Sequence, residues 1–143
     1  MSHYDTNLDK NNANYVPLTP LTFLKRAKES YPNYEAVIYE DRKYSWDQVY
    51  KRTVKFASAL KKIGVKKGDT VSFLAFNTPE IFEGHYSVPM TGAVLNTINI
   101  RLDAKTIAYI LDHSEAKVLV VDRQLHVEVK KALKALNLSL IHI

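Results

Sequence analysis

The sequence predicts an α/β protein in which an N-terminal β-hairpin and helices precede a parallel βαβαβα unit. Apolar runs at 70–76, 93–98 and 117–121 each precede an amphipathic segment with helix-start signals. Strands that alternate with helices, joined by right-handed crossovers, form a doubly wound parallel sheet. The chain has 143 residues, of which 46% are hydrophobic and 24% charged, so it suits one domain with a substantial core.

Two helices and a hairpin are predicted before residue 70. Thr22 can cap a short helix that Pro32 ends. Residues 35–46 alternate around a Glu40–Asp41 turn, which is typical of a β-hairpin. The apolar residues of the short helix are Phe23, Leu24 and Ala27.

The longest predicted helix has clear signals at both ends. Ser45 and Gln48 match the S-x-x-Q capping box. Gly64 lies where a left-handed residue closes a helix, and Val65 can fold back onto the last turn. The expected buried stripe is Val49, Thr53, Phe56, Ala57, Leu60 and Ile63.

The run 70–76 is nearly continuous in apolar residues, as in a strand covered on both faces. Thr78 is expected to cap the next helix, with Pro79 at its first position. That helix should reach about Val88, where Pro89 closes it.

The second strand covers 93–98, and Asp103 is expected to cap the helix after it. The third strand, 117–121, precedes a last helix that ends near Leu136. The inward residues of the middle helix are Ile107, Ile110 and Leu111.

Candidate binding residues follow from this topology, because ligands of such sheets lie beyond the carboxyl ends of the strands. Arg101 is the best candidate for a functional charge, although a structural arginine is slightly favoured. His85 lies within a helix and is interpreted as packed or hydrogen-bonded rather than as a general base. The residues at the strand ends are Asn77, Thr78, Asn99, Arg101, Asp122 and Arg123.

Several kinds of self-contained site are excluded. The four glycines match neither GxGxxG nor GxxxxGK[ST], so dinucleotide and P-loop sites are absent. There are no cysteines, and the five histidines lack a short metal-ligand spacing. The run Asp112, His113 and Ser114 is better read as a helix C-terminus than as a catalytic triad. We therefore assign no catalytic, cofactor-binding or metal-binding residue.

The net charge of +5 is concentrated between Arg42 and Lys67, which hold nine of the twenty basic residues. These lysines alternate with apolar positions at helical spacing, so a solvated helix face is favoured over a nucleic-acid site. The polar, Asn-rich residues 1–16 predict a disordered tail without the apolar core of a signal peptide. No apolar run approaches the roughly 20 residues of a membrane helix. A soluble cytoplasmic protein is expected.

An ordered series of motifs then adds a family resemblance. The chain resembles the N-terminal region of acyl-activating, adenylate-forming enzymes, the fatty acyl-CoA synthetases and their AMP-binding relatives. The segment NANYVPLTPLTFL is similar to the short- and medium-chain branch, including plant-type acyl-activating enzymes and methylmercaptopropionate-CoA ligases. The motifs are LTPLTFL, YSW, ALKKIGVKKGDTV, FNTPE, GHYSVPMTGAVLNTINIRLD and IAYILDHSEAKVLVVD.

The resemblance implies a ligase that uses ATP and Mg²⁺ to form an acyl-adenylate and then transfers the acyl group to coenzyme A. The phosphate loop, ribose-binding aspartate and mobile catalytic lysine of the family would all lie downstream. Residues 17–137 would be the N-terminal part of the large AMP-binding domain, inactive alone. The matching positions Asn77, Asn99 and Arg101, with His85, are carried over only as crevice candidates.

The ending LSLIHI, residues 138–143, is expected to be a non-native tail. It can be encoded by CTG TCT CTT ATA CAC ATC, which resembles a transposon end used as a sequencing adapter. A fourth native strand is the alternative for this segment. A stand-alone, non-catalytic α/β binding or regulatory module is the alternative for the whole chain.

Overall fold

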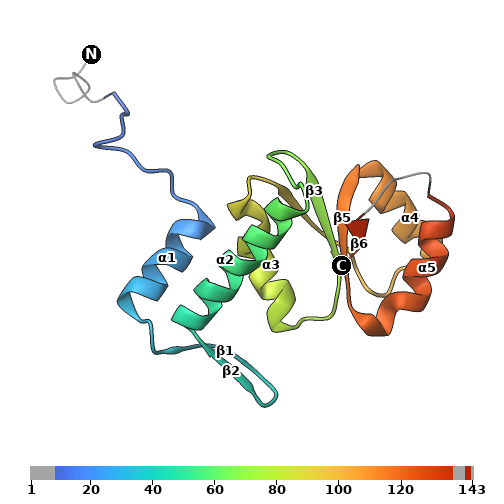
Figure 1. Cartoon of the computed structure of the whole chain (residues 1–143), viewed down its shortest axis with the longest axis horizontal. Coiled ribbons are helices and arrows are strands. Elements are labelled where there is room, and N and C mark those ends of the chain that lie inside the picture. Colours follow the sequence, from blue (N-terminus) through green and yellow to red (C-terminus); the bar gives the residue numbers. More distant parts are fainter. Residues whose placement is uncertain (1–8, 137–140, 143) are drawn as a thin grey trace.

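A computed structural model describes residues 9–136 and 141–142 as a parallel sheet with helices on both faces and a separate β-hairpin (Figure 1). The elements are α1 (Pro20–Ser30), β1 (Glu35–Tyr39), β2 (Arg42–Ser45), α2 (Trp46–Lys62), β3 (Thr70–Leu74), α3 (Pro79–Met90), β4 (Val94–Thr97), α4 (Ala104–His113), β5 (Ala116–Val121), the 3₁₀ turn Arg123–Leu125, α5 (His126–Lys134) and β6 (Ile141–His142).

The sheet has the strand order β4-β3-β5-β6, and its neighbouring strands are parallel. Helices α1, α2 and α3 lie on one side of it, and α4 and α5 lie on the other (Figure 1). From β3 the chain goes to β4 on one side, and from β4 it crosses back over β3 to β5 on the other side. The direction in which strands are added therefore reverses at β3. The predicted α/β class and the parallel arrangement are confirmed.

Alternating side chains of the central strands divide the core into two clusters. Val71 and Phe73 of β3 face α2 and α3, where they join a cluster that includes Leu60 and Val88. Leu74 faces the other side, in the cluster of α4 and α5. Complete burial of one such side chain contributes about 1.5–3 kcal/mol, so the two clusters together make a large favourable contribution to stability.

Ser72 interrupts the apolar pattern of β3 but has hydrogen-bonding partners. It is fully buried and pairs in register with Asn96 of β4. The Asn96 amide donates to Ser72 Oγ at 3.0 Å and to Ser114 Oγ at 3.2 Å. A buried hydroxyl is tolerated here because it accepts a hydrogen bond within the sheet.

Local signals define α2 as predicted. Ser45 and Gln48 form the reciprocal capping box. Gly64 has a φ of 95°, and its N–H donates to the Lys61 carbonyl at 3.0 Å. The Val65 N–H reaches the Leu60 carbonyl at 3.1 Å, which completes a Schellman motif.

One end of the predicted α2 stripe is wrong. Ile63 is 36% exposed, because it is the C-cap residue at the end of the helix. Phe56 is half-buried and packs edge-to-face against Phe73, with ring centroids 6.0 Å apart.

The predicted start of α1 is also wrong. Thr19 is the N-cap, and Thr22 is the third helical residue, whose side chain bonds back to the Thr19 N–H. Pro20 is suited to the first turn because its missing N–H needs no partner there. Phe23 is 54% exposed, so Leu24 is the buried residue of this helix.

Helix α3 continues past its predicted end at Val88. It runs to Met90, with Pro89 inside the last turn. Proline lacks an N–H and its ring crowds the carbonyl four residues earlier, but near a C-terminus both effects fall on the last turn only, so the helix can finish that turn. Thr78 has the extended backbone of an N-cap, but its side chain makes no capping hydrogen bond.

The two ends of the chain are described only in part. Residues 9–16 are exposed and contain no helix or strand, and residues 1–8 lie outside the described residues. Within the predicted tail, Ile141–His142 form β6, which pairs with β5 at the edge of the sheet and so has a strand on one side. Residues 137–140 and 143 lie outside the described residues, and the foreign origin of the tail stays a prediction.

Gly84 of α3 lies against the ring of Phe73. A Cβ at this position would be 2.8 Å from Phe73 Cζ and 3.0 Å from Cε1. Phe73 is 1% exposed and is also held by Phe56, so its ring has little room to move. The absence of a side chain at Gly84 therefore sets how closely α3 approaches the sheet.

We predict that Gly84→Ala destabilises the chain despite the better helix propensity of alanine. Overpacking costs about 1–3 kcal/mol, whereas the propensity gain is about 1 kcal/mol at most. Urea unfolding followed by circular dichroism should show a lower midpoint. Phe73→Leu should lower the free energy of unfolding less in the Gly84→Ala background than in the wild type. A higher midpoint for Gly84→Ala would contradict the packing argument.

Candidate functional site

The loops after β3 and β4 form a hollow of about 510 Å³ at the carboxyl edge of the sheet. Asn77 follows β3, and Asn99 and Arg101 follow β4, so parallel pairing of the two strands brings these three side chains to one place. The aliphatic residues Ile81, Ile98 and Ile100 complete much of the lining. Three of the predicted crevice candidates thus line the same hollow.

The β4–α4 loop that carries Arg101 is shaped by hydrogen bonds. The Ile98 N–H donates to the Phe73 carbonyl at 2.8 Å and extends the pairing of β3 with β4. Asn99 Oδ1 accepts from the Arg101 N–H at 2.9 Å, which forms an Asx turn. Arg101 is exposed at the rim of the hollow.

Asp122 and Arg123 lie at the same edge but do not line this hollow. The Asp122 N–H donates to the Leu74 carbonyl at 3.0 Å, which joins the ends of β3 and β5. Asp122 Oδ1 accepts from the Gln124 N–H at 2.9 Å and caps the short 3₁₀ turn. This pair is therefore separate from Asn77, Asn99 and Arg101.

His85 lies in a second hollow, of about 630 Å³, between β1 and α3. Its ring Nδ1 is 2.8 Å from the Ile81 carbonyl oxygen, one turn earlier in the same helix. Asn77 lines both hollows. The surroundings of His85 are mainly apolar and include Val37, Ile38, Tyr39, Pro79, Phe82 and Tyr86.

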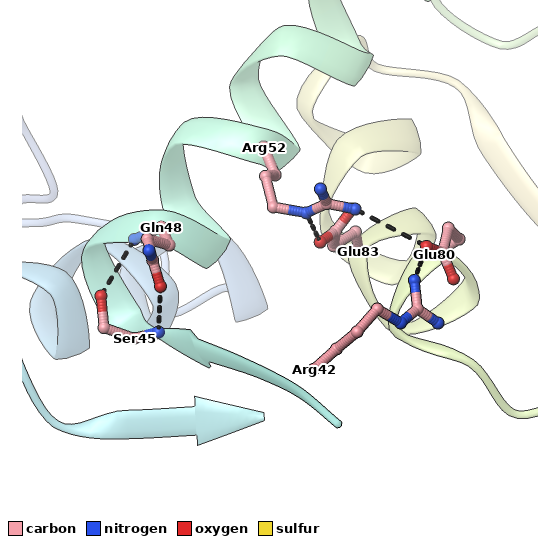
Figure 2. Close-up of polar contacts among 6 residues, drawn as sticks. All are labelled: Arg42, Ser45, Gln48, Arg52, Glu80 and Glu83. Atoms are coloured by element: carbon pink, nitrogen blue, oxygen red, sulfur yellow. Dashed lines mark hydrogen bonds and ion pairs between the residues drawn. The ribbon is translucent and has the colours of Figure 1, made fainter. Parts of the chain in front are cut away.

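An ion-pair network that the sequence analysis did not identify connects the hairpin, α2 and α3 (Figure 2). Arg52 Nε donates to Glu83 Oε1, and Arg52 also lies 3.7 Å from a Glu80 oxygen. Arg42 donates to Glu80 at 2.6 Å. The Arg52 guanidinium lies 4.6 Å from the centre of the Tyr44 ring.

Glu83 is 5% exposed, and an isolated buried carboxylate would be strongly unfavourable. Helical spacing could have revealed this position, since Glu83 lies four residues from both Pro79 and Ser87, which are buried. A carboxylate on the buried face of a helix requires a cationic partner. The identity of that partner, Arg52, could not be read from spacing.

Glu80 illustrates competing effects on one carboxyl. Burial raises its pKa, but the hydrogen bonds from Arg42 and from the Glu80 backbone N–H outweigh this, so the pKa is lowered. Its contribution to stability is therefore present above the pKa of the unfolded chain and is lost as the pH falls through the lower folded pKa. Glu80 thus joins α3 to the hairpin, and Glu83 joins α3 to α2.

The residues present do not fit a phosphate loop or a resident metal site. Gly64, Gly68 and Gly92 adopt positive φ, and Gly84 packs against Phe73, so all four glycines serve the fold. Within residues 9–136 and 141–142, no three His, Asp or Glu side chains are grouped so that they could hold a metal ion. None of the described helices is long and apolar enough to cross a membrane.

We predict that Arg52→Ala lowers the free energy of unfolding by about 2–3 kcal/mol, because it leaves the Glu83 carboxylate buried without its partner. Arg42→Ala is the matched control, since its partner Glu80 is about half exposed and surface pairs contribute little. Chemical denaturation of both variants provides the measurement. Equal effects of the two substitutions would show that burial of Glu83 is unimportant.

Comparison with known proteins identifies several that are similar to most of this chain. Trans-cinnamate:CoA ligase of Petunia hybrida is 54% identical over 129 residues, which cover 90% of this chain and 23% of the relative. Butyrate–CoA ligase AAE11 of Arabidopsis thaliana is 56% identical over 110 residues, covering 77% and 19%. The crystal structure of the anthranilate CoA ligase AuaEII with anthranoyl-AMP matches with a TM-score of 0.80 and 25% identity, covering 86% of this chain and 24% of that one.

The chain thus spans about a fifth to a quarter of the length of these relatives. Its fold agrees with that of the anthranilate CoA ligase over 86% of its own length. The family model described as AMP-binding enzyme matches residues 24–142. On these grounds, the chain belongs to the AMP-binding enzyme family.

Proposed function

We propose that this chain is the N-terminal part of an ATP-dependent, AMP-forming acid–CoA ligase. The observation that carries the proposal is the 54% identity to trans-cinnamate:CoA ligase across 90% of this chain. That match covers 23% of the relative, so the chain corresponds to part of a longer protein. The placement of residues 17–137 in the N-terminal part of a larger AMP-binding domain is part of the proposal. The activity is proposed for the longer protein.

The proposed reaction has two balanced steps. A carboxylate oxygen of the acid attacks the α-phosphorus of ATP, which gives an acyl-adenylate and releases pyrophosphate. The sulfur of coenzyme A then attacks the acyl carbon, and the thioester forms as AMP leaves. Mg²⁺ would accompany the ATP phosphates and offset their negative charge.

The acid is proposed to be small. The two relatives are named for cinnamate, which is aromatic, and for butyrate, which is a short aliphatic acid. These names favour a small or medium carboxylic acid over a long acyl chain. A role in fatty-acid metabolism is part of the proposal only in the sense that butyrate is itself a short fatty acid.

Within this proposal the described residues act mainly as scaffold. They build the sheet and orient its carboxyl edge, and their ion pairs join the hairpin to α3 through Arg42 and Glu80, and α2 to α3 through Arg52 and Glu83. The chain contains no glycine-rich loop, and the glycines that it has support turns and packing. We therefore assign no catalytic residue. Nucleic acid is not among the proposed partners, and a cytoplasmic location stays a prediction.

The reading frame beyond the codon for Asn137, read from the gene, tests the first part of the proposal. Continuation into a Ser/Thr/Gly-rich loop with a lysine is expected. The encoded full-length protein should then release pyrophosphate with ATP, Mg²⁺ and a small acid, and should form acyl-CoA when coenzyme A is added. A native stop codon at this point would favour a separate non-catalytic module instead.

We predict that the 143-residue chain alone releases no pyrophosphate above a buffer blank. Adenylation needs charge stabilisation at the reacting phosphate and an aligned carboxylate, and this chain supplies no phosphate loop for the first requirement. A coupled pyrophosphate assay with ATP, Mg²⁺ and a panel of short and medium acids measures this, with the full-length protein as positive control. Turnover by the chain that is lost on changing Arg101 or His85 would refute the prediction.

A further inference from the structure

We propose that the outer face of α2 and the turn after it bind a lipid surface that carries negative charge. This basic band consists of Lys55, Lys61, Lys62, Lys66 and Lys67. The proposal goes beyond the ligase activity and does not rest on it, because no lysine of the band lines the hollow at the carboxyl edge of the sheet.

Charge is distributed unevenly along this part of the chain. Seven basic residues and no acidic residue lie between Asp47 and Asp69. Lys51 is paired with Asp47, and Arg52 is paired with Glu83. Within the part of the chain that the structure describes, the five lysines of the basic band form no ion pair. The band therefore keeps its positive charge.

Helical spacing places the lysines of α2 opposite its buried stripe. Val49, Thr53 and Leu60 are buried. Lys55 and Lys62 are seven residues apart, which is about two helical turns, so they share one face. Both are exposed, and they lie about half a turn from the buried residues. The helix thus presents positive charge on the side that does not pack against the domain.

The turn after α2 extends the band. Gly64 follows the helix with a φ of 95°, and Lys66 and Lys67 are exposed beyond it. Asp69 is the nearest acid in the sequence, and its Oδ2 accepts from the Lys66 backbone N–H at 2.8 Å, which stabilises the turn. A single carboxylate offsets at most one of the five positive charges. The band therefore has an excess of positive charge.

The same charges require this face to stay at the surface of the longer protein. Moving an unpaired ammonium group from water into a protein interior is strongly unfavourable. Covering the band would therefore require acidic partners for its lysines. We expect the face to remain accessible when the rest of the ligase is present.

The chemistry of the band favours lipid headgroups. Lysines carry compact charges on flexible stems, which suit many separate headgroups, whereas bidentate recognition of a single phosphate favours arginine. Val54 and Ile63 are exposed next to Lys55 and Lys62. Apolar side chains beside cations can enter the boundary between headgroups and acyl chains. Clustered lysines on the polar face of a helix are a recognised pattern for anionic membranes.

The aromatic residues of α2 are poorly placed to stack on nucleic-acid bases. Phe56 packs edge-to-face on Phe73, with ring centroids 6.0 Å apart. Lys28 Nζ lies 5.6 Å from the centre of the Tyr50 ring. Sites for single-stranded nucleic acid combine positive charge with stacking aromatic side chains. The band supplies the charge without the stacking.

Co-sedimentation of the 143-residue chain with lipid vesicles tests the proposal. The vesicles contain phosphatidylcholine with about one third phosphatidylserine, and pure phosphatidylcholine vesicles are the neutral control. We expect binding to the anionic vesicles that falls at least about tenfold in about 0.5 M NaCl, because salt screens exposed charges. Equal binding to the two kinds of vesicle would overturn the proposal.

Neutralising two lysines at a time locates the surface. A lysine close to an anionic membrane strengthens binding by about fivefold, so Lys55→Gln combined with Lys62→Gln should weaken binding at least about tenfold. Lys66→Gln combined with Lys67→Gln removes the same charge outside the helix and should have a similar effect. Wild-type affinity of both double variants would refute the assignment to this band.

The matched control is Lys130→Gln combined with Lys134→Gln. These exposed lysines belong to α5, on the other side of the sheet (Figure 1). The control removes the same net charge, and its affinity should stay within about twofold of the wild type, since exposed charges act over about one Debye length. An equal loss in the control and in the band variants would show that net charge alone drives binding, which would overturn the proposal.

Other anionic partners give a different result. A poly-glutamate peptide and a single-stranded oligonucleotide are titrated in the same buffer. Tighter binding of either one than of the anionic vesicles, with the same dependence on the band, would overturn the choice of lipid. Weaker binding of both supports it.

The lipid proposal and the proposed function fail separately. The full-length protein should bind the anionic vesicles with the same dependence on the band, and loss of binding when the rest of the protein is present would overturn the lipid proposal alone. A full-length protein that binds vesicles but forms no acyl-CoA would refute only the proposed function. The vesicle measurement decides the lipid proposal in either case, because it requires no turnover.

Discussion

Strand β3 is the element on which the rest of the structure depends. It pairs with β4 on one edge and β5 on the other, and residues 71–74 are each at most 1% exposed. A parallel strand covered in this way satisfies its backbone through its neighbours and its side chains through helices on both faces. The close contact of Gly84 with Phe73 then sets the position of α3. The two hollows bordering α3 follow from that position.

The arginines differ in role between the α2–α3 contact and the carboxyl edge of the sheet. Between α2 and α3, the carboxylate of Glu83 is buried and paired with Arg52, so the charges there hold helices together. At the carboxyl edge, Arg101 is exposed, and Asp103, two residues later, caps α4. The same residue type is therefore paired between two helices in one place and exposed at the edge of the sheet in the other. Sequence spacing alone does not distinguish these two situations.

The segment that this chain shares with its AMP-binding relatives is rich in residues that support the fold. Identity of 54–56% to two plant CoA ligases extends over a segment whose glycines all serve turns or packing. The high identity of this segment to the two plant ligases is consistent with a sheet whose close packing tolerates few changes of side-chain volume. Even a methyl group added at Gly84 would force Phe73 of the central strand to shift, since core packing leaves little free volume.

What the sequence by itself determined is the local part of the structure. The capping box of Ser45 and Gln48, the left-handed Gly64 and the apolar run of β3 are encoded within a few residues, so the order of the elements could be predicted. Errors arose where two local signals compete. Thr19 and Thr22 can both cap a helix, and Pro89 near a helix end can either stop it or occupy its last turn.

Tertiary structure alone decided the contacts between distant segments. Asn77 and Asn99 converge because β3 pairs with β4, and Arg52 meets Glu83 because α2 packs on α3. Strand order and helix packing result from burying apolar surface over the whole chain, and no short motif carries them. The candidates at the strand ends could therefore be named from sequence, but their shared hollow and the partners of the other charges could not.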